Sequence, residues 1–318
     1  MDNVRAEALN QPIFVVGPLR SGTSLLRLLI GGHSQINCFG EFEGAVSEAK
    51  GDEWPILEEY YEFLVNDRQT SNYQFNVDKS LKYECLVRSF LGQLYDRKPS
   101  RFIGSSVHSR IDLLPKLWPN AKFIHLLRDP RDVARSCIGM GWVGNVYYGA
   151  NYWLEPERHW DSLCSMTEPS NRLTVKYEDL VCHPEEKLSE ICQFLGLDFE
   201  AEMLAVDENS TYSRPNAKYA EQWKSKLSPE EVRWVECVCA GKMEERGYTL
   251  ASDPLKPLTS FEKLKLWIDN RTYRVRFNIG RYGFYLWFMY VTSKKIGLKW
   301  AKSKYQKRVN KINAQHLK

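Results

Sequence analysis

The sequence lacks several features that would mark a membrane-spanning or secreted protein. Its 318 residues contain no run of about 18 apolar residues, the length that a membrane-spanning helix needs. The first twelve residues, MDNVRAEALNQP, hold no basic segment followed by an apolar one, so we expect no secretory signal peptide. No internal repeat or low-complexity tract is present. These absences favour a cytoplasmic protein.

The cysteines also lack any arrangement typical of a metal site. The eight cysteines form no C-x-x-C pair and show no spacing of metal ligands. We therefore expect no bound metal, and reduced thiols that serve as small hydrophobic side chains in a reducing compartment. With 43% hydrophobic and 26% charged residues, the composition supports a packed core and excludes a disordered chain.

Positive charge is concentrated near the C-terminus. Residues 255–318 contain 16 Lys and Arg and only two acidic residues, a net charge of +14, whereas residues 1–254 have a net charge of −10. The composition changes around residues 252–257. We therefore predict a domain over residues 1–254, followed by a basic, aromatic-rich, mainly helical extension over residues 255–318 that meets an anionic partner.

Three short apolar segments predict buried parallel strands, at residues 12–16, 122–127 and 173–177. A predicted helix follows each of them, at residues 25–30, 131–140 and 184–195. This alternation predicts an α/β fold of three layers, with helices on both faces of a central parallel sheet. The carboxyl ends of parallel strands share one edge of a sheet, where ligands bind. Arg20 and Arg128, which follow the first two strands, should therefore lie together.

The loop after the first strand resembles a phosphate-binding loop. Gly17–Ser24 nearly matches G-x-x-x-x-G-K-[ST], but Thr23 replaces the lysine that reaches the β- and γ-phosphates of a nucleoside triphosphate. The pattern therefore disfavours a kinase or ATPase while keeping a P-loop-like anion site at a helix N-terminus. Arg20 within the loop can bind a second anionic group. The phosphate-wrapping residues would be Ser21, Gly22, Thr23 and Ser24.

A second cluster of polar residues follows the strand at residues 122–127. Its sequence is RDPRDVARS, from Arg128 to Ser136. Arg128 at the strand end and Ser136 two helical turns later can reach one further phosphate. The aspartates at 129 and 132 are expected to cap the helix or pair with its arginines.

With both motifs in place, the sequence resembles the sulfotransferases that use 3′-phosphoadenosine 5′-phosphosulfate (PAPS). The resemblance covers about residues 12–250 and is nearest to the bacterial-type branch, with a more distant similarity to protein-tyrosine sulfotransferases. Residues 18–24 resemble the 5′-phosphosulfate loop, and residues 123–136 resemble the 3′-phosphate motif. Further similar stretches are KYEDL at 176–180, QFLGL at 193–197 and MEERGY at 243–248.

This resemblance implies an O-sulfotransferase that releases 3′,5′-bisphosphoadenosine (PAP). It implies that Arg20 stabilises the transferring sulfuryl group, and that Arg128 and Ser136 hold the 3′-phosphate. It also implies that Tyr177 and Arg214 complete the nucleotide site. No metal is needed, because basic side chains and loop amides can carry the charge.

Two residues are candidates for the base that takes the acceptor proton. Glu41 resembles the catalytic glutamate of the protein-tyrosine branch, and His108 resembles the catalytic histidine of the cytosolic branch. The resemblance does not choose between these two candidate bases. Relatives carry a lysine where this chain has Ser106. Either Arg20 alone assists the leaving group, or another cation takes the place of that lysine. Lys79 and Lys82 are candidates.

The acceptor is best described as a hydroxyl of a carbohydrate or glycolipid. The aromatic-rich stretch at 141–160 suits sugar rings, and the basic tail suits an anionic membrane surface or an acidic glycan. A phenol, a tyrosyl peptide, a P-loop kinase and an inactive nucleotide-binding module remain alternatives. The sequence is compatible with a monomer or a homodimer. Nucleic acid is not expected, because no binding fold accompanies the positive charge.

Overall fold

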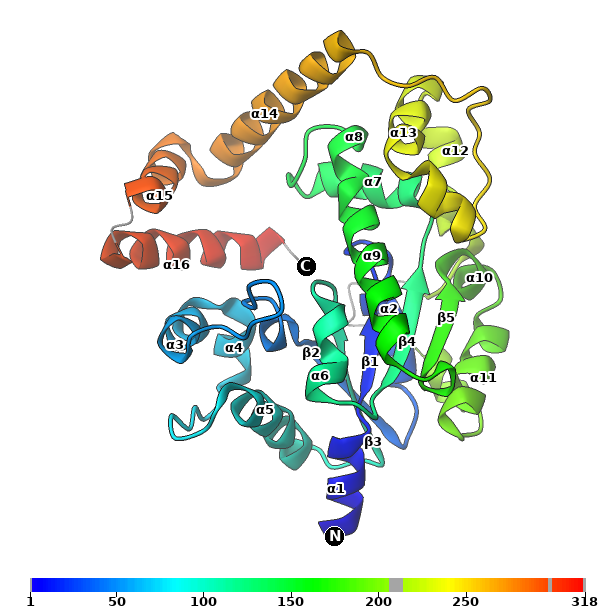
Figure 1. Ribbon diagram of the computed structural model, residues 1–318, viewed down its shortest axis with the longest axis vertical. Coiled ribbons are helices and arrows are strands. Elements are labelled where there is room, and N and C mark those ends of the chain that lie inside the picture. Colours follow the sequence, from blue (N-terminus) through cyan, green and yellow to red (C-terminus); the bar gives the residue numbers. More distant parts are fainter. Residues whose placement is uncertain (1, 206–213, 297–298, 317–318) are drawn as a thin grey trace.

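A parallel β-sheet forms the centre of the computed structural model, which describes residues 2–205, 214–296 and 299–316 (Figure 1). Its five strands run in the spatial order β2-β3-β1-β4-β5, and every neighbouring pair is parallel. The strands are β1 (Ile13–Val16), β2 (Ile36–Glu41), β3 (Phe102–Val107), β4 (Lys122–Leu127) and β5 (Arg172–Lys176).

Helices cover both faces of this sheet. On one face, apolar side chains of the sheet form a core with α2 (Thr23–Ile30), α10 (Tyr177–Cys182) and α11 (Pro184–Leu195). On the other face, a larger core includes residues of α1 (Asp2–Asn10), α3 (Leu57–Asn66), α5 (Tyr83–Arg97), α6 (Leu114–Leu117) and α9 (Asn151–Met166). The predicted three-layer α/β fold is confirmed.

A third apolar cluster fixes the helix that follows β4. It joins α7 (Pro130–Gly139), α8 (Val146–Gly149) and α13 (Pro229–Glu245). The buried Arg131 guanidinium supports the start of α7, because it pairs with Asp129 at 2.6 Å and with Glu236 at 2.9 Å. Asp129 caps α7 by accepting from the Arg131 amide, as predicted. The short helices α4 (Arg68–Tyr73) and α12 (Trp223–Lys226) complete the body.

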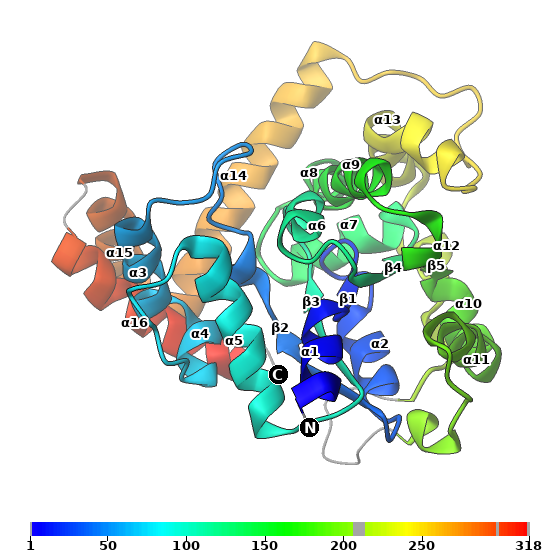
Figure 2. The same cartoon turned by 60° about the horizontal axis from the view of Figure 1, so that its bottom comes forward.

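The C-terminal segment consists of three helices that extend from the body (Figure 2). They are α14 (Ser260–Tyr282), α15 (Phe284–Ile296) and α16 (Lys299–His316). Among the contacts between this segment and the body, Arg233 of α13 pairs with Glu262, Gly144 donates its amide to Asn270 Oδ1 at 2.7 Å, and Ser303 Oγ lies 2.8 Å from Asn66 Oδ1. None of the helices in the described residues is long and apolar enough to cross a bilayer. The proposed division at residue 254 remains a prediction.

The strands predicted from the sequence are present as β1, β4 and β5, each within one residue of its expected bounds. Strands β2 and β3 were not predicted. Glu41 is the last residue of β2, and residues 104–107 are part of β3. These two strands place both candidate bases beside the loop that follows β1.

Candidate active site

The loop after β1 has an unusual backbone conformation that brings it against β4. Gly17, Arg20 and Gly22 have φ angles of 150°, 72° and 99°. A Cβ atom on Gly17 would lie 2.6 Å from the Leu126 carbonyl oxygen, and one on Gly22 would lie 2.6 Å from the Tyr177 ring. Both positions therefore need glycine, and the loop is tightly packed where its backbone turns into α2.

The loop leads directly into the N-terminus of α2. Gly22 is its N-cap and provides no side-chain hydrogen bond, so the first amides of α2 have no side-chain cap. Thr23 is buried and Ser24 is half-buried. The buried Ser21 hydroxyl donates to the Pro18 carbonyl at 2.6 Å, so it stabilises the loop itself. Anion binding here would thus depend mainly on backbone amides and the helix dipole.

Arg20 joins the loop to the second motif. The Arg20 carbonyl accepts a hydrogen bond of 3.0 Å from the Arg128 guanidinium, and Arg20 Nε donates to Ser136 Oγ at 3.0 Å. The structure therefore brings Arg20 together with two residues that lie 108 and 116 positions later in the sequence. Arg20 is exposed, so its guanidinium can reach a ligand above the sheet edge.

Arg128 rests on an aromatic ring. Leu127 pairs with Lys176 across β4 and β5, and this register places the next residues, Arg128 and Tyr177, side by side. The Arg128 guanidinium carbon lies 4.1 Å from the Tyr177 ring centroid. Burial raises the pKa of Tyr177, while the Arg128 charge acts to lower it. The phenol therefore stays neutral and serves as a platform for the cation.

One hydrogen-bond donor of the Arg128 guanidinium has no partner in the described structure. Arg128 Nε is buried, and in the described structure it has no hydrogen-bond partner. The nearest carboxylate, Asp132, is 4.0 Å from the Arg128 guanidinium, and burial raises its pKa while Arg128 opposes that shift. A buried donor without a partner is costly, and a phosphate oxygen would satisfy it. The site thus fits an anionic ligand.

The two candidate bases form a pair. Val16 pairs with Val107 across β1 and β3, so His108 lies beside Gly17. His108 Nδ1 donates to the Gly17 carbonyl at 3.1 Å, since a carbonyl can only accept, and Nε2 lies 3.8 Å from Glu41 Oε1. Glu41 and His108 are therefore neighbours in one unit.

Burial and charge act in opposite directions on His108. Burial disfavours the imidazolium, but the contact with Glu41 and the charge of Glu43 outweigh it, so the pKa of His108 is raised. The His108 side chain is 4% exposed, whereas the Glu41 side chain is 36% exposed. This difference makes Glu41 the member of the pair that an acceptor can approach.

Glu43 is a residue of this site that sequence reasoning missed. Its carboxylate accepts from the amides of His108 at 2.9 Å and Ser109 at 2.7 Å, and from the Ser109 hydroxyl. The carboxylate therefore fixes the end of β3 and, with it, the imidazole. The only signal in the sequence was a second glutamate two positions after Glu41.

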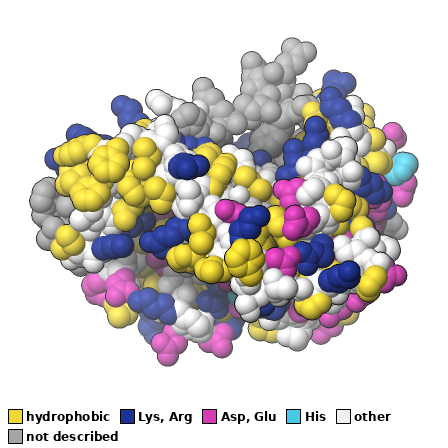
Figure 3. Space-filling model, turned by 90° about the horizontal axis from the view of Figure 1, so that it is seen from above, with side chains coloured by type: hydrophobic (Ala, Val, Ile, Leu, Met, Phe, Trp, Pro, Cys, Tyr) yellow, Lys and Arg dark blue, Asp and Glu magenta, His cyan; other side chains and the backbone are white. Residues whose placement is uncertain are grey.

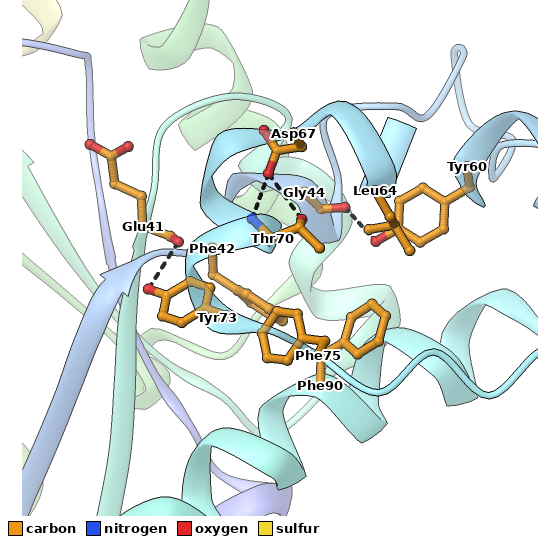
Figure 4. Close-up of a pocket in the computed structure, with 10 residues that line it drawn as sticks. All are labelled: Glu41, Phe42, Gly44, Tyr60, Leu64, Asp67, Thr70, Tyr73, Phe75 and Phe90. Atoms are coloured by element: carbon orange, nitrogen blue, oxygen red, sulfur yellow. Dashed lines mark hydrogen bonds between the residues drawn. The ribbon is translucent and has the colours of Figure 1, made fainter. Parts of the chain in front are cut away.

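An aromatic pocket lies under the backbone of Glu41 (Figure 4). The Tyr73 hydroxyl donates to the Glu41 carbonyl at 3.3 Å, and the Glu41 carboxylate points away from the rings. The pocket therefore holds the main chain of Glu41, while its carboxylate lies outside the pocket, 3.8 Å from His108 Nε2. Its lining residues are Glu41, Phe42, Gly44, Tyr60, Leu64, Asp67, Thr70, Tyr73, Phe75 and Phe90.

Ser106 occupies the position where the family resemblance implies a lysine. Ser106 is fully buried, and its hydroxyl has no hydrogen-bond partner in the described part of the chain. Lys79 and Lys82 are both exposed, and the Lys79 ammonium lies over the Tyr61 ring at 5.4 Å. Arg214 is exposed where the described chain resumes after residue 213. The functions of these four residues stay predictions.

Two large aromatics of the 141–160 stretch belong to the core and not to an acceptor surface. Trp153 is fully buried and donates to the Arg128 carbonyl at 2.8 Å. Trp160 is 5% exposed and stacks on His125 at 4.3 Å. Trp142 and Tyr152 are half-buried and stack on each other. Trp153 therefore supports the backbone of Arg128, and packing explains the burial of Trp153 and Trp160. The tyrosines at 147 and 148, like Trp142 and Tyr152, are half-buried.

Comparison with known proteins agrees with this geometry. The sulfotransferase family matches residues 12–201, more than half of the chain. Protein-tyrosine sulfotransferase A of Caenorhabditis elegans is 27% identical over 203 residues, which are 60% of this chain and 51% of that protein. Carbohydrate sulfotransferase 1 of Danio rerio is 32% identical over 169 residues, 42% of this chain and 40% of that protein.

A solved structure has the same fold at low sequence identity. The sulfotransferase domain from the curacin biosynthetic pathway superposes with a TM-score of 0.55 at 20% identity, covering 76% of this chain and 98% of that domain. The chain spans about half the length, or less, of several of the curated relatives that it matches. The family match over residues 12–201 and the shared fold lead to one conclusion: the chain belongs to the sulfotransferase family.

Proposed function

We propose that this protein transfers a sulfuryl group from PAPS to an acceptor hydroxyl. The observation that carries the proposal is the meeting of Arg20, Arg128 and Ser136 at the carboxyl edge of the sheet, beside the N-terminus of α2. This edge offers two anion sites, one on loop amides and one on a guanidinium, as a donor with 5′- and 3′-phosphates requires.

The donor would bind with its two ends on the two motifs. The 5′-phosphosulfate lies against the amides of residues 21–24, and the 3′-phosphate lies on Arg128 and Ser136. The buried, unpartnered Arg128 Nε and the Tyr177 platform support this assignment. Thr23 in place of the triphosphate-binding lysine argues against a kinase. Arg214 is proposed to contact the nucleotide from the segment after residue 213.

The transfer needs one proton acceptor and one stabiliser of negative charge. The acceptor oxygen attacks sulfur as its proton passes to the Glu41 carboxylate; the bond from sulfur to the bridging phosphate oxygen breaks, and PAP leaves. Arg20 stabilises charge on the sulfuryl and bridging oxygens. His108 holds Glu41 in position through Nε2, 3.8 Å away. Glu41 thus takes the base role, and His108 is its positioning residue.

The acceptor is proposed to be a hydroxyl of a carbohydrate or glycolipid. The similarity to a carbohydrate sulfotransferase supports it, while the similarity to a protein-tyrosine sulfotransferase keeps a tyrosyl or phenolic acceptor as the second candidate. We propose that the protein acts in the cytoplasm, in agreement with cysteines that are all free in the structure.

The proposal can be tested with radiolabelled sulfate on PAPS. The full-length protein is incubated with a panel of glycans, glycolipids, phenols and tyrosyl peptides, and label is followed into each acceptor. We expect transfer by the wild type and at least a hundredfold loss in Arg20→Ala, in the range found for removal of one oxyanion donor, about 10²–10³. PAP binding without transfer to any acceptor would instead indicate an inactive nucleotide-binding module.

A further inference from the structure

Helix α14 is held to the body along one side only. The Asn145 side chain donates to the Leu266 carbonyl at 2.8 Å, and Asn270 Oδ1 accepts from the Gly144 amide. One turn further, the Tyr273 hydroxyl donates to the backbone at the end of α7 at 3.1 Å. Leu266, Asn270 and Tyr273 are spaced by three or four residues, so they form one face, which we call the inner face.

The opposite side of α14 carries exposed apolar side chains. Phe261 is 76% exposed, Leu264 54% and Ile268 48%. Their spacing of three and four residues places them on one stripe. At 100° per residue this stripe lies across the helix from Leu266 and Asn270. Within the described residues, this apolar stripe faces away from the body and stays about half exposed or more.

Helix α15 also carries exposed apolar side chains. Phe284 is 62% exposed, Tyr285 66% and Phe288 50%. Figure 3 shows hydrophobic side chains gathered at the end of the molecule where α15 lies, with lysine and arginine side chains close by. Such a cluster of large apolar side chains is typical of an interaction surface. We call it, with the α14 stripe, the outer surface: Phe261, Leu264, Trp267, Ile268, Phe284, Tyr285 and Phe288.

Positive charge surrounds this outer surface. Lys263, Lys265, Arg271 and Arg274 on α14 are exposed, and the Arg271 guanidinium lies 5.7 Å from the Trp267 ring. Residues 255–318 contain only two acidic residues. One of them, Glu262, is bound by Arg233 and by the Thr259 amide. The charge complements an anionic partner that also accepts apolar and aromatic side chains.

We propose that the outer surface binds an anionic lipid bilayer, with α14 and α15 lying on it. A bilayer offers an apolar interior for Phe261 and Ile268, an interface suited to Trp267, and anionic headgroups for the flanking cations. Neither a protein core nor a sugar polymer offers all three together. The bilayer contact is peripheral, because the described helices are not long and apolar enough to span.

This contact would hold the candidate active site at the membrane surface. The inner face of α14 is hydrogen-bonded to the end of α7 and to the segment after it, and α7 carries Ser136, which Arg20 contacts. If the proposed sulfuryl transfer is correct, the favoured acceptor is therefore a hydroxyl on a lipid-linked molecule rather than on a free sugar. This last step depends on the proposed function, whereas bilayer binding does not.

The test is co-sedimentation of the full chain with vesicles. Vesicles of phosphatidylcholine alone are compared with vesicles that also contain phosphatidylglycerol, at low and physiological salt. The apolar test variant is Phe261→Ser with Ile268→Ser. Its matched control is Val4→Ser with Met166→Ser, which removes exposed apolar side chains of 51% and 45% exposure from α1 and α9. A charge variant combines Lys265→Ala and Arg271→Ala.

We expect binding to phosphatidylglycerol vesicles that weakens with salt, and little binding to phosphatidylcholine. The apolar variant should lose on the order of tenfold in partition coefficient, and the charge variant roughly fivefold for each cation removed. The control should bind as the wild type does.

Equal binding by the apolar variant and the wild type, or no vesicle binding by the wild type, would overturn the proposal. So would a wild-type dimer that the apolar variant dissociates without any vesicle binding, because the outer surface would then cover a second copy. PAP binding, measured in parallel by calorimetry, reports on the proposed function independently and should not change in these variants.

Discussion

The glycine at the start of α2 provides a quantitative test of the loop geometry. Gly22 has a φ of 99°, and a Cβ atom there would lie 2.6 Å from Cδ2 and Cε2 of Tyr177. A left-handed non-glycine residue costs about 1–3 kcal/mol. Displacing a packed ring costs about another 1–3 kcal/mol, and this ring is also held by Arg128 at 4.1 Å. We therefore expect Gly22→Ala to lower the free energy of unfolding by about 2–6 kcal/mol.

Urea denaturation, followed by circular dichroism, measures this difference. Gly241→Ala is the matched control, because its Cβ would meet nothing within 4 Å and it lies inside α13, where alanine is favoured by up to about 1 kcal/mol. Adding Tyr177→Ala to Gly22→Ala removes the clash, so the double variant should lose less stability than the two single variants together. A Gly22→Ala protein as stable as the wild type would refute the loop conformation described above.

The remaining predictions concern the pair of candidate bases. Glu41→Gln should lower kcat by about 10²–10⁴-fold, because the amide cannot take a proton, while PAP affinity in calorimetry stays the same; near wild-type turnover would remove Glu41 from the base role. Because the pKa of His108 is raised in the folded chain, its protonation should stabilise the fold fully below about pH 6.5, the unfolded value. That stabilisation should fade as the pH rises through the folded pKa. His108→Gln should lack this dependence in thermal unfolding scans across pH, and matching pH curves would contradict the assignment.

The parts of the fold that the sequence predicted are those with a strong apolar signal. β1 is a continuous apolar run and β4 is apolar apart from Lys122 and His125, so both patterns predict buried parallel strands. β3 is completely buried, yet its sequence FIGSSV contains glycine and two serines, and β2 has the sequence INCFGE. The side chains of β2 and β3 do not indicate that these strands are buried. Their burial follows from the pairing of β3 with β1 and of β2 with β3, which joins residues far apart in the sequence.

Candidate residues of the site could be proposed from the sequence, but most contacts between them could not. The two motifs predicted that Arg20 and Arg128 would lie at one sheet edge, and the structure shows their hydrogen bond. The contact between Glu41 and His108 could not be predicted, because it depends on β2 and β3 and on the register that sets Val16 against Val107. Glu43 was missed for the same reason, since its partners lie 65 and 66 positions away.

The central claim is that Arg128 recognises a 3′-phosphate. Isothermal titration calorimetry of PAP, with 5′-AMP and ATP as controls, tests it most directly in the wild type and in Arg128→Ala. The account predicts that PAP binds, that 5′-AMP without the 3′-phosphate binds at least about tenfold more weakly, and that Arg128→Ala removes this preference, as expected for loss of a charge-assisted pair worth about 2–5 kcal/mol. ATP binding as tight as that of PAP, or an Arg128→Ala protein that still prefers PAP to 5′-AMP, would contradict it.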